Sequence, residues 1–285
     1  MTGVAVVSDS NAYLPGQLAQ ANGLTMLQQY VCFADGRRVH EDDVDLDAFF
    51  EEMRSAEQLP TTTHPTTEDF RTAYEQLLAS AEAIVSVHSS GQLSHTVQAA
   101  AEAAEQLGAT DRIHVVDSLS AGGGLGVIAL AAARRAAAGE SAERVVATAE
   151  DARSEMKMWF AIDSLEFLRR GRRIGAASAW VGSTLRVKPI LTMEDGQMKP
   201  VERVRSAERA LERLVDYARQ RHSSGADAWV VQHVRSPELA DKLTDRAREV
   251  FGTDPVFCSE IGAVVGAHVG PGLLGLGGLP PRLLT

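Results

Sequence analysis

Short apolar runs that alternate with amphipathic helical segments are the feature that most limits the fold of this chain. In its first half, the runs Val4–Val7, Ala83–Val87 and Ile113–Val116 have the length and the β-branched content of buried strands. The stretches between them carry apolar residues at helical spacing, as in residues 70–77. This alternation predicts an α/β fold whose first half forms a mostly parallel sheet.

The second half carries a different signal, a β-hairpin. Asp195-Gly196 lies between the apolar runs Pro189–Met193 and Lys199–Val204, and Asp-Gly in such a place favours a two-residue hairpin turn. We therefore predict two domains. Residues 1–157 form an N-terminal, mostly parallel α/β domain, and residues 158–285 form a C-terminal α/β domain with antiparallel strands. A chain of 285 residues is long enough to give each domain a core.

Other local patterns complete the expected elements. Thr66 and Asp69 resemble a capping box, and Ser206 and Ser236-Pro237 are typical helix starts. The stretch 270–281 holds five glycines, which predicts a turn-rich tail. Further strands are expected at four apolar runs: Trp159–Ile162, Ala228–Val231, Pro255–Cys258 and Val264–Ala267.

Charge and composition exclude several classes of function. The formal net charge of −10 disfavours binding to nucleic acid and to anionic membranes in general. The eight histidines are scattered without metal-ligand spacing, and no dinucleotide or Walker fingerprint appears, so we expect no metal and no dedicated cofactor. The chain starts without a signal-peptide pattern, and no apolar run reaches the roughly 18 residues of a membrane span. We therefore expect a cytoplasmic protein.

Polar residues follow four of the expected strands. Ligands of open α/β sheets bind beyond the carboxyl ends of strands, where hydroxyls and helix N-termini suit an anion. A carboxylate or phosphate head group would fit such a polar rim. The alternative is that these residues only cap the helices that follow. The four segments are Ser8-Asp9-Ser10, His88-Ser89-Ser90, Asp117-Ser118 and Asp163-Ser164.

Seven segments in order resemble the DegV family of bacterial fatty acid-binding proteins, and the likeness covers nearly the whole chain. Each segment alone is a weak signal, but seven in the right order and spacing are a strong one. The segments are Ser8-Asp9-Ser10 with Leu14-Pro15, Thr62–Thr66, Ser89–Thr96, Asp117-Ser118 with Gly122–Gly126, Asp163–Ile174, Lys188–Leu191 with Asp195-Gly196, and Gly262–Gly272.

This resemblance implies a function without catalysis by the chain itself. It implies two α/β domains with a long-chain fatty acid held between them in an apolar tunnel. It also implies a separate ATP-dependent kinase subunit that phosphorylates the presented carboxylate, so that the acyl phosphate feeds phospholipid synthesis. The bound fatty acid is then a ligand rather than a cofactor, and contact with a membrane or an acyltransferase is transient.

The resemblance also assigns roles to single residues. Thr62 and Ser94 match the positions that hold the carboxylate, with Thr63 as an alternative because the threonine run leaves the register open by one. His268 matches a histidine near the head group. The basic residues expected to face the phosphate or the kinase are Arg172, Arg173 and Arg203, with Arg205 extending the same rim.

Three residues depart from the family pattern. His64 stands in place of the usual Gln, His95 in place of the Gly after Ser94, and Arg172 in place of the second Gly of the Gly-Gly-Arg-Ile element. His95 brings a titratable ring to the carboxylate position, so we include it among the head-group residues.

Two other functions fit the same residues. The polar rim would also bind another small carboxylated or phosphorylated metabolite. Alternatively, Asp117-Ser118 with His95 and His268 supplies the residue types of a stand-alone acyl hydrolase or transferase, although the chain has no G-x-S-x-G nucleophile elbow. Uptake of lipid distinguishes the fatty acid carrier from the metabolite binder. Turnover of an ester or acyl phosphate without a partner identifies the hydrolase or transferase.

Overall fold

The chain forms two compact units that are not continuous in sequence. A computed structural model describes residues 3–55, 58–180 and 187–285. Unit 1 comprises Met1–Gln29, His64–Met156 and Pro281–Thr285, and unit 2 comprises Tyr30–Thr63 and Lys157–Pro280. This division departs from the predicted one, because residues 30–63 pack with the second unit and residues 281–285 with the first.

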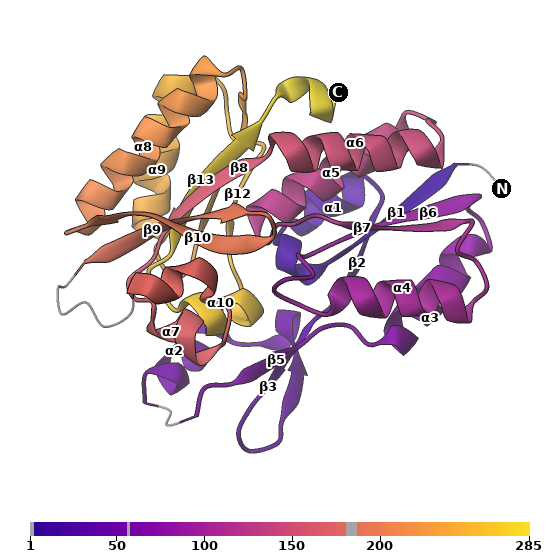
Figure 1. The fold of residues 1–285 in the computed structure, drawn as a ribbon, viewed down its shortest axis with the longest axis horizontal. Helices are drawn as coiled ribbons and strands as arrows, with labels where there is room; N and C mark the ends of the chain where they lie inside the picture. Colours follow the sequence, from indigo (N-terminus) through magenta and orange to yellow (C-terminus); the bar gives the residue numbers. More distant parts are fainter. Residues whose placement is uncertain (1–2, 56–57, 181–186) are drawn as a thin grey trace. The chain divides into compact units, whose positions relative to one another are not determined.

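Unit 1 is built on a four-stranded parallel sheet in the order β2-β1-β6-β7. Helices α3 and α4 cover one face, and α5 and α6 cover the other (Figure 1). The strands are β1 (Val4–Asp9), β2 (Leu24–Leu27), β6 (Ala83–His88) and β7 (Ile113–Asp117). The helices are η1 (Ser10–Ala12), α1 (Gly16–Ala21), α3 (Thr67–Leu78), α4 (Thr96–Gln106), α5 (Gly123–Ala137), α6 (Ala142–Glu155) and η4 (Pro281–Leu284).

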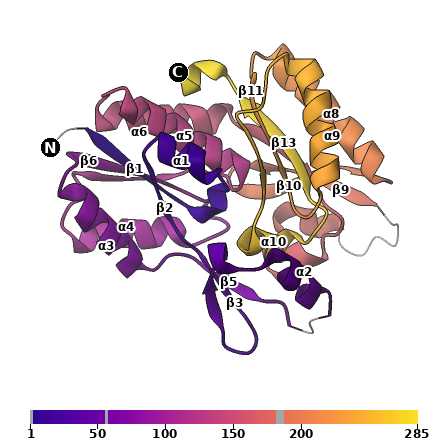
Figure 2. The same ribbon diagram turned by 180° about the vertical axis from the view of Figure 1, so that it is seen from behind.

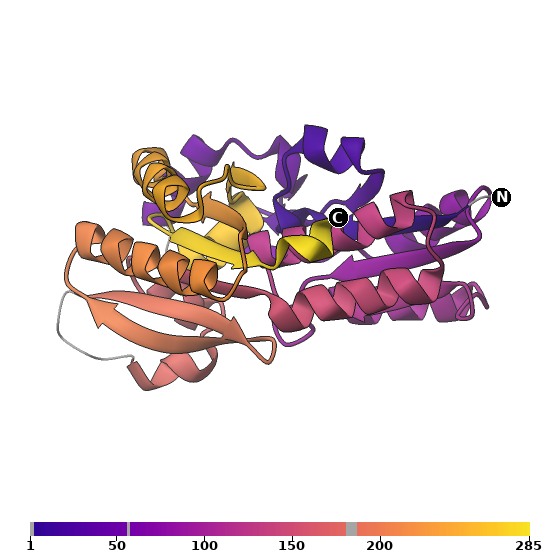
Figure 3. The ribbon, with the colours of Figure 1, turned by 90° about the horizontal axis from the view of Figure 1, so that it is seen from above.

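Unit 2 contains a six-stranded sheet in the order β10-β9-β8-β13-β11-β12, in which only β11 and β12 are parallel. Helix α8 lies along this sheet (Figure 3) and forms a core with α9 and the strands beneath. The strands are β8 (Lys157–Ala161), β9 (Lys188–Glu194), β10 (Gln197–Val204), β11 (Ala228–His233), β12 (Phe257–Glu260) and β13 (Leu274–Leu279). The helices are α7 (Glu166–Arg170), η3 (Gly175–Trp180), α8 (Ala207–Ser223), α9 (Pro237–Phe251) and α10 (Ala263–Val269).

A small sheet in unit 2 comes from the early segment of the chain. Its order is β4-β3-β5, all antiparallel, with β3 (Tyr30–Cys32), β4 (Arg38–His40) and β5 (Thr61–Thr63). Between β4 and β5 lie η2 (Glu41–Asp43) and α2 (Leu46–Ser55). Helices α2 and α10 are neighbours (Figure 2), and a side chain on Gly266 of α10 would collide with the ring of Phe50 at 2.7 Å. Residues far apart in sequence therefore share this part of unit 2.

The predicted α/β class is confirmed, with the parallel sheet in the first half and antiparallel pairs in the second. The predicted hairpin is also confirmed. Asp195 and Gly196 have φ of 52° and 76°, as a type I′ turn requires, and Glu194 pairs with Gln197 across it. The capping box at Thr66 and Asp69 is present as well. Within the described residues, no helix combines the length and the apolar character needed to cross a membrane.

Two predictions for the last part of the chain are wrong. Residues 264–267 belong to helix α10 rather than to a strand. The glycine-rich stretch contains β13, a fully buried strand between β8 and β11 rather than a turn-rich tail. Its glycines permit close packing, because a side chain on Gly278 would meet the backbone oxygen of Ala228 at 2.9 Å.

Candidate functional site

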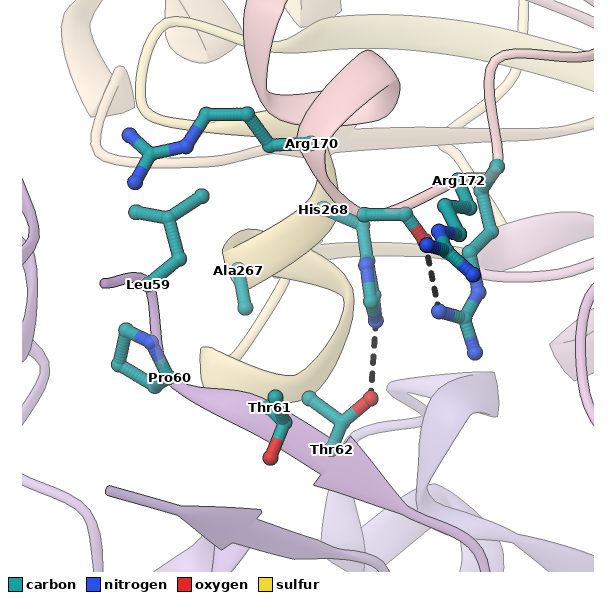
Figure 4. A pocket seen from close by; sticks show the side chains of 10 residues that line it. Leu59, Pro60, Thr61, Thr62, Arg170, Arg172, Ala267 and His268 are labelled. Atoms are coloured by element: carbon teal, nitrogen blue, oxygen red, sulfur yellow. Dashed lines mark hydrogen bonds between the residues drawn. The ribbon is translucent and has the colours of Figure 1, made fainter. Parts of the chain in front are cut away.

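Unit 2 contains a pocket of about 310 Å³ whose walls combine basic and hydroxyl side chains with apolar ones (Figure 4). Three arginines, two threonines and a histidine are among its ten lining residues. These groups are hydrogen-bond donors and cations, so the pocket is suited to an anionic group. The lining residues are Leu59, Pro60, Thr61, Thr62, Arg170, Gly171, Arg172, Arg173, Ala267 and His268.

Strand alternation decides which threonine meets the histidine. In β5, Thr62 pairs with Val31 and is partly buried, whereas its neighbours Thr61 and Thr63 are exposed. Successive side chains of a strand point to opposite faces, so only Thr62 can turn to the side where His268 lies. Its hydroxyl oxygen is 2.8 Å from Nε2 of His268 (Figure 4). Thr63 is not among the lining residues.

His268 is held as a neutral ring. Burial, together with the charge of Arg173, lowers the pKa of His268 to about 4. Its Nδ1 is covered and has no partner among the described residues. A lone pair at Nδ1 leaves no N–H donor unpaired there, which favours the tautomer with the proton on Nε2. In that tautomer His268 donates to Thr62, and the hydroxyl proton of Thr62 is left to donate to an anion.

The turn after α7 packs closely against this histidine. A side chain on Gly171 would lie 2.4 Å from Nδ1 of His268, so only glycine fits there without displacing the ring. The carbonyl oxygen of Gly171 accepts a hydrogen bond from Nη1 of Arg173 at 2.7 Å. Burial lowers the pKa of Arg173, but a guanidinium stays protonated in proteins. Arg173 thus supplies a fixed positive charge to the pocket.

Arg172 adopts a backbone conformation that glycine favours. Its φ is 59°, in the left-handed region, at the position where the related motif has glycine. A side chain in that region costs roughly 1 kcal/mol relative to glycine. The departure therefore places a third guanidinium at the pocket wall and strains the backbone there.

Two other arginines, Arg169 and Arg203, are not among the lining residues of the pocket. Arg203, on β10, stacks its guanidinium over the ring of Trp180 at 4.4 Å. Arg169 pairs with Glu166 at 2.7 Å. Of the predicted basic residues, Arg172 and Arg173 line the pocket, together with Arg170, whereas Arg203 and Arg205 are not among the lining residues.

Ser94 and His95 belong to unit 1. The hydroxyls of Ser94 and Thr96 are 2.7 Å apart at the start of α4. His95 is exposed, and its ring packs edge to face against His64, with centroids 6.1 Å apart. The two histidine departures are therefore neighbours in space. A shared head-group site formed by Ser94, His95 and Thr62 stays a prediction.

The polar rim expected at the strand ends is largely used inside unit 1. Ser8, Asp9, His88 and Ser89 are buried and hydrogen-bonded to one another or to the backbone. Among the residues the structure describes, no group of three or more His, Cys, Asp or Glu side chains is placed to hold a metal ion.

Sequence reasoning missed several lining residues. Leu59 and Pro60 carry no sequence signal for this role. Gly171 lies within the matched segment Asp163–Ile174, but only its close approach to His268 shows why glycine is needed there.

Comparisons with known proteins agree on one family. The family model described as "Uncharacterised protein, DegV family COG1307" matches residues 3–280. The DegV domain-containing protein SCO2569 of Streptomyces coelicolor is 38% identical over 275 residues, which is 96% of this chain and 97% of that protein. Protein DegV of Bacillus subtilis is 31% identical, over 96% of this chain and 98% of that protein.

Solved structures give the same result. A structure described as fatty acid binding of a DegV family protein from Thermus thermophilus matches with a TM-score of 0.88 and 30% identity, covering 98% of this chain and 100% of the other. DegV of Bacillus subtilis, described as a fatty acid binding protein, matches with a TM-score of 0.84 and 29% identity, covering the same shares of the two chains.

Proposed function

The chain belongs to the DegV family, and from that premise we propose that it binds one long-chain fatty acid and presents the carboxylate to a separate ATP-dependent kinase subunit. The acyl phosphate formed there feeds phospholipid synthesis. In this proposal the chain carries and orients the ligand, and the partner supplies the phosphoryl-transfer chemistry.

One observation carries the proposal, the Thr62–His268 pair beside Arg173. The pair leaves a hydroxyl proton to donate to a carboxylate oxygen, and the nearby guanidinium favours the anion. Two related structures, at 30% and 29% identity, are described as binding fatty acids, which supports the same ligand class. The tail would supply most of the affinity, because each buried methylene contributes about 0.8 kcal/mol.

The head-group chemistry also suits a ligand that must react. A hydroxyl and a neutral imidazole orient a carboxylate without locking it in a buried ion pair, so it stays available to a kinase. In the same proposal, the incoming phosphate or the kinase faces three arginines: Arg172, Arg173 and Arg203. An Arg173→Ala variant is expected to carry lipid and to slow phosphorylation by the kinase. An unchanged rate would remove that role.

The ligand itself is the first thing to test. Organic extraction of the denatured protein followed by mass spectrometry should release about one fatty acid per chain. Protein that yields no lipid and takes up no added fatty acid would contradict the proposal.

A matched pair of variants tests the head-group contact. Thr62→Val and Thr63→Val remove the same hydroxyl from adjacent positions of β5. We expect Thr62→Val to weaken fatty acid binding about tenfold, the effect of losing one hydrogen bond to a charged group, and Thr63→Val to leave it unchanged. Isothermal titration measures both. Equal effects of the two substitutions would remove Thr62 from the carboxylate site.

A small carboxylated or phosphorylated metabolite is the second candidate, favoured by the three arginines that line the pocket and by its modest volume. It would compete with fatty acid and would bind protein stripped of lipid. The serine named for a stand-alone acyl hydrolase is not activated by a histidine in the described structure, because the hydroxyl of Ser118 donates to the backbone oxygen of Ser120 at 3.3 Å.

A further inference from the structure

A single carboxylate organises the buried polar residues of unit 1. Asp9, at the end of β1, is fully buried and accepts hydrogen bonds from five donors. The donors are Nδ1 of His88 at 2.9 Å, the amide and hydroxyl of Ser89 at 3.2 and 2.9 Å, Nε2 of Gln29 at 2.9 Å, and the amide of Asn11 at 3.2 Å. A carboxylate with this many donors is well satisfied in a buried setting.

The histidine in this network extends it along one face of β6 to helix α3. Because Nδ1 of His88 donates to Asp9, its Nε2 accepts from the hydroxyl of Ser86 at 2.7 Å, and Ser86 accepts from the hydroxyl of Tyr74 at 2.8 Å. The order Asp-His-Ser resembles that of a hydrolase triad. Ser86 is fully buried, however, and engaged on both sides, so no substrate can reach it. The network therefore serves to hold the structure.

The first segment held by Asp9 carries Ser94. Ser89, bound twice to Asp9, is followed by Ser90, whose carbonyl oxygen accepts from the amides of Leu93 at 2.9 Å and Ser94 at 3.0 Å. The amide of Ser90 is itself anchored to the carbonyl of Ser120 at 2.8 Å. The position of Ser94 thus depends on a short chain of hydrogen bonds that starts at Asp9.

The second segment held by Asp9 is the end of the first stretch of unit 1, at Gln29. Gln29 is the last residue of unit 1 before the chain enters the segment Tyr30–Thr63 of unit 2. Its side chain donates to Asp9, and its amide donates to the hydroxyl of Ser10 at 3.1 Å. One carboxylate therefore holds both the base of the turn that carries Ser94 and Gln29, the last residue of unit 1 before the chain enters unit 2.

We propose that Asp9 is a positioning residue for fatty acid head-group recognition: by holding Ser89, it fixes the turn that carries Ser94. This inference rests on the proposed function. A donor that is already held in place loses little freedom when the ligand binds, so the network increases selectivity for the carboxylate without touching the ligand.

The test compares two ligands that share a tail and differ in the head group, hexadecanoic acid and hexadecanol. In Asp9→Asn, we expect binding of the acid to weaken about tenfold and binding of the alcohol to change less than twofold. Tyr74→Phe is the matched control, since it removes a buried hydroxyl from the far end of the same network. It should lower stability and leave the ratio of acid to alcohol affinity unchanged. Equal losses for acid and alcohol in Asp9→Asn would overturn the proposal.

A second measurement tests the proposal if Asp9→Asn does not fold. It also separates failure of the positioning role from failure of the proposed function. Ser89→Ala removes one side-chain link between Asp9 and the turn and leaves the carboxylate in place. Hydrogen exchange of lipid-free protein should then show faster exchange at the amides of Leu93 and Ser94 than in wild type or Tyr74→Phe. Unchanged exchange at both amides would refute the positioning role. Failure of the wild type to bind hexadecanoic acid would refute the proposed function instead.

Discussion

Substituting Gly171 with alanine tests the packing that holds His268 in the pocket. The backbone at Gly171 has φ of −75°, which alanine adopts without strain, so the whole effect arises from the added methyl group. That carbon would lie 2.4 Å from Nδ1 of His268, so the ring must retreat by about 1 Å to reach an ordinary contact. Such a shift breaks the 2.8 Å bond to Thr62. Overpacking costs about 1–3 kcal/mol and the lost bond about 1 kcal/mol, which gives roughly 2–4 kcal/mol.

Urea unfolding followed by fluorescence measures this cost, and titration with a fatty acid measures the effect on the pocket. Gly16→Ala is the control, because Gly16 also lacks a positive φ and has open space around it. The control should be neutral or slightly stabilising. We expect Gly171→Ala to lose stability and to bind fatty acid about tenfold more weakly. Stability within 0.5 kcal/mol of wild type, with affinity unchanged (~0.5 kcal/mol being typical of surface substitutions), would refute the reasoning.

Three further predictions concern the same unit. Arg172→Gly should raise the free energy of unfolding by about 1 kcal/mol in urea titrations, since it relieves a left-handed φ of 59°. His268 has a pKa of about 4 in the folded state, below the usual 6.5, so the unfolded chain binds the proton more readily between those values. Stability should therefore fall by about 3 kcal/mol as the pH drops from 6.5 to 4, and urea titrations of His268→Gln should lack this part of the loss. Glu41→Ala removes the carboxylate that accepts from the amide of Val264 at 2.7 Å, which should cost about 1–3 kcal/mol and speed hydrogen exchange at the start of α10.

The elements that depend on a few neighbouring residues could be predicted from the sequence. The turn at Asp195-Gly196 and the cap at Thr66 each depend on a few neighbouring residues, and both are present. Residues 264–267 illustrate the opposite case, because four apolar residues suit a strand or a helix equally well. Their helical state is set by distant groups, among them the carboxylate of Glu41 and the ring of Phe50.

The glycine-rich stretch after residue 270 shows how composition misleads. Glycine favours turns in general, but in β13 it permits close packing in the middle of a sheet. The candidate site likewise depends on contacts between distant segments. The threonine run leaves Thr62 and Thr63 as candidates for the carboxylate contact, and only the pairing of β5 with β3 turns Thr62 toward His268. Three identical residues in a row do not reveal how β5 pairs with β3.

The interrupted course of unit 2 has a consequence for synthesis of the protein. Residues 30–63 leave the ribosome on the order of a hundred residues before the strands and helices of 157–280 with which they pack. Synthesis adds about 5–20 residues per second. Phe49 and Phe50 are both buried in the finished fold, and they therefore lack their native neighbours for several seconds or more after they are synthesised. The nascent chain thus passes through an interval in which apolar side chains are open to chaperones or to aggregation. A substitution that delays the arrival or docking of α10 would lengthen that interval and lower the yield of folded protein, even if the finished structure were unchanged.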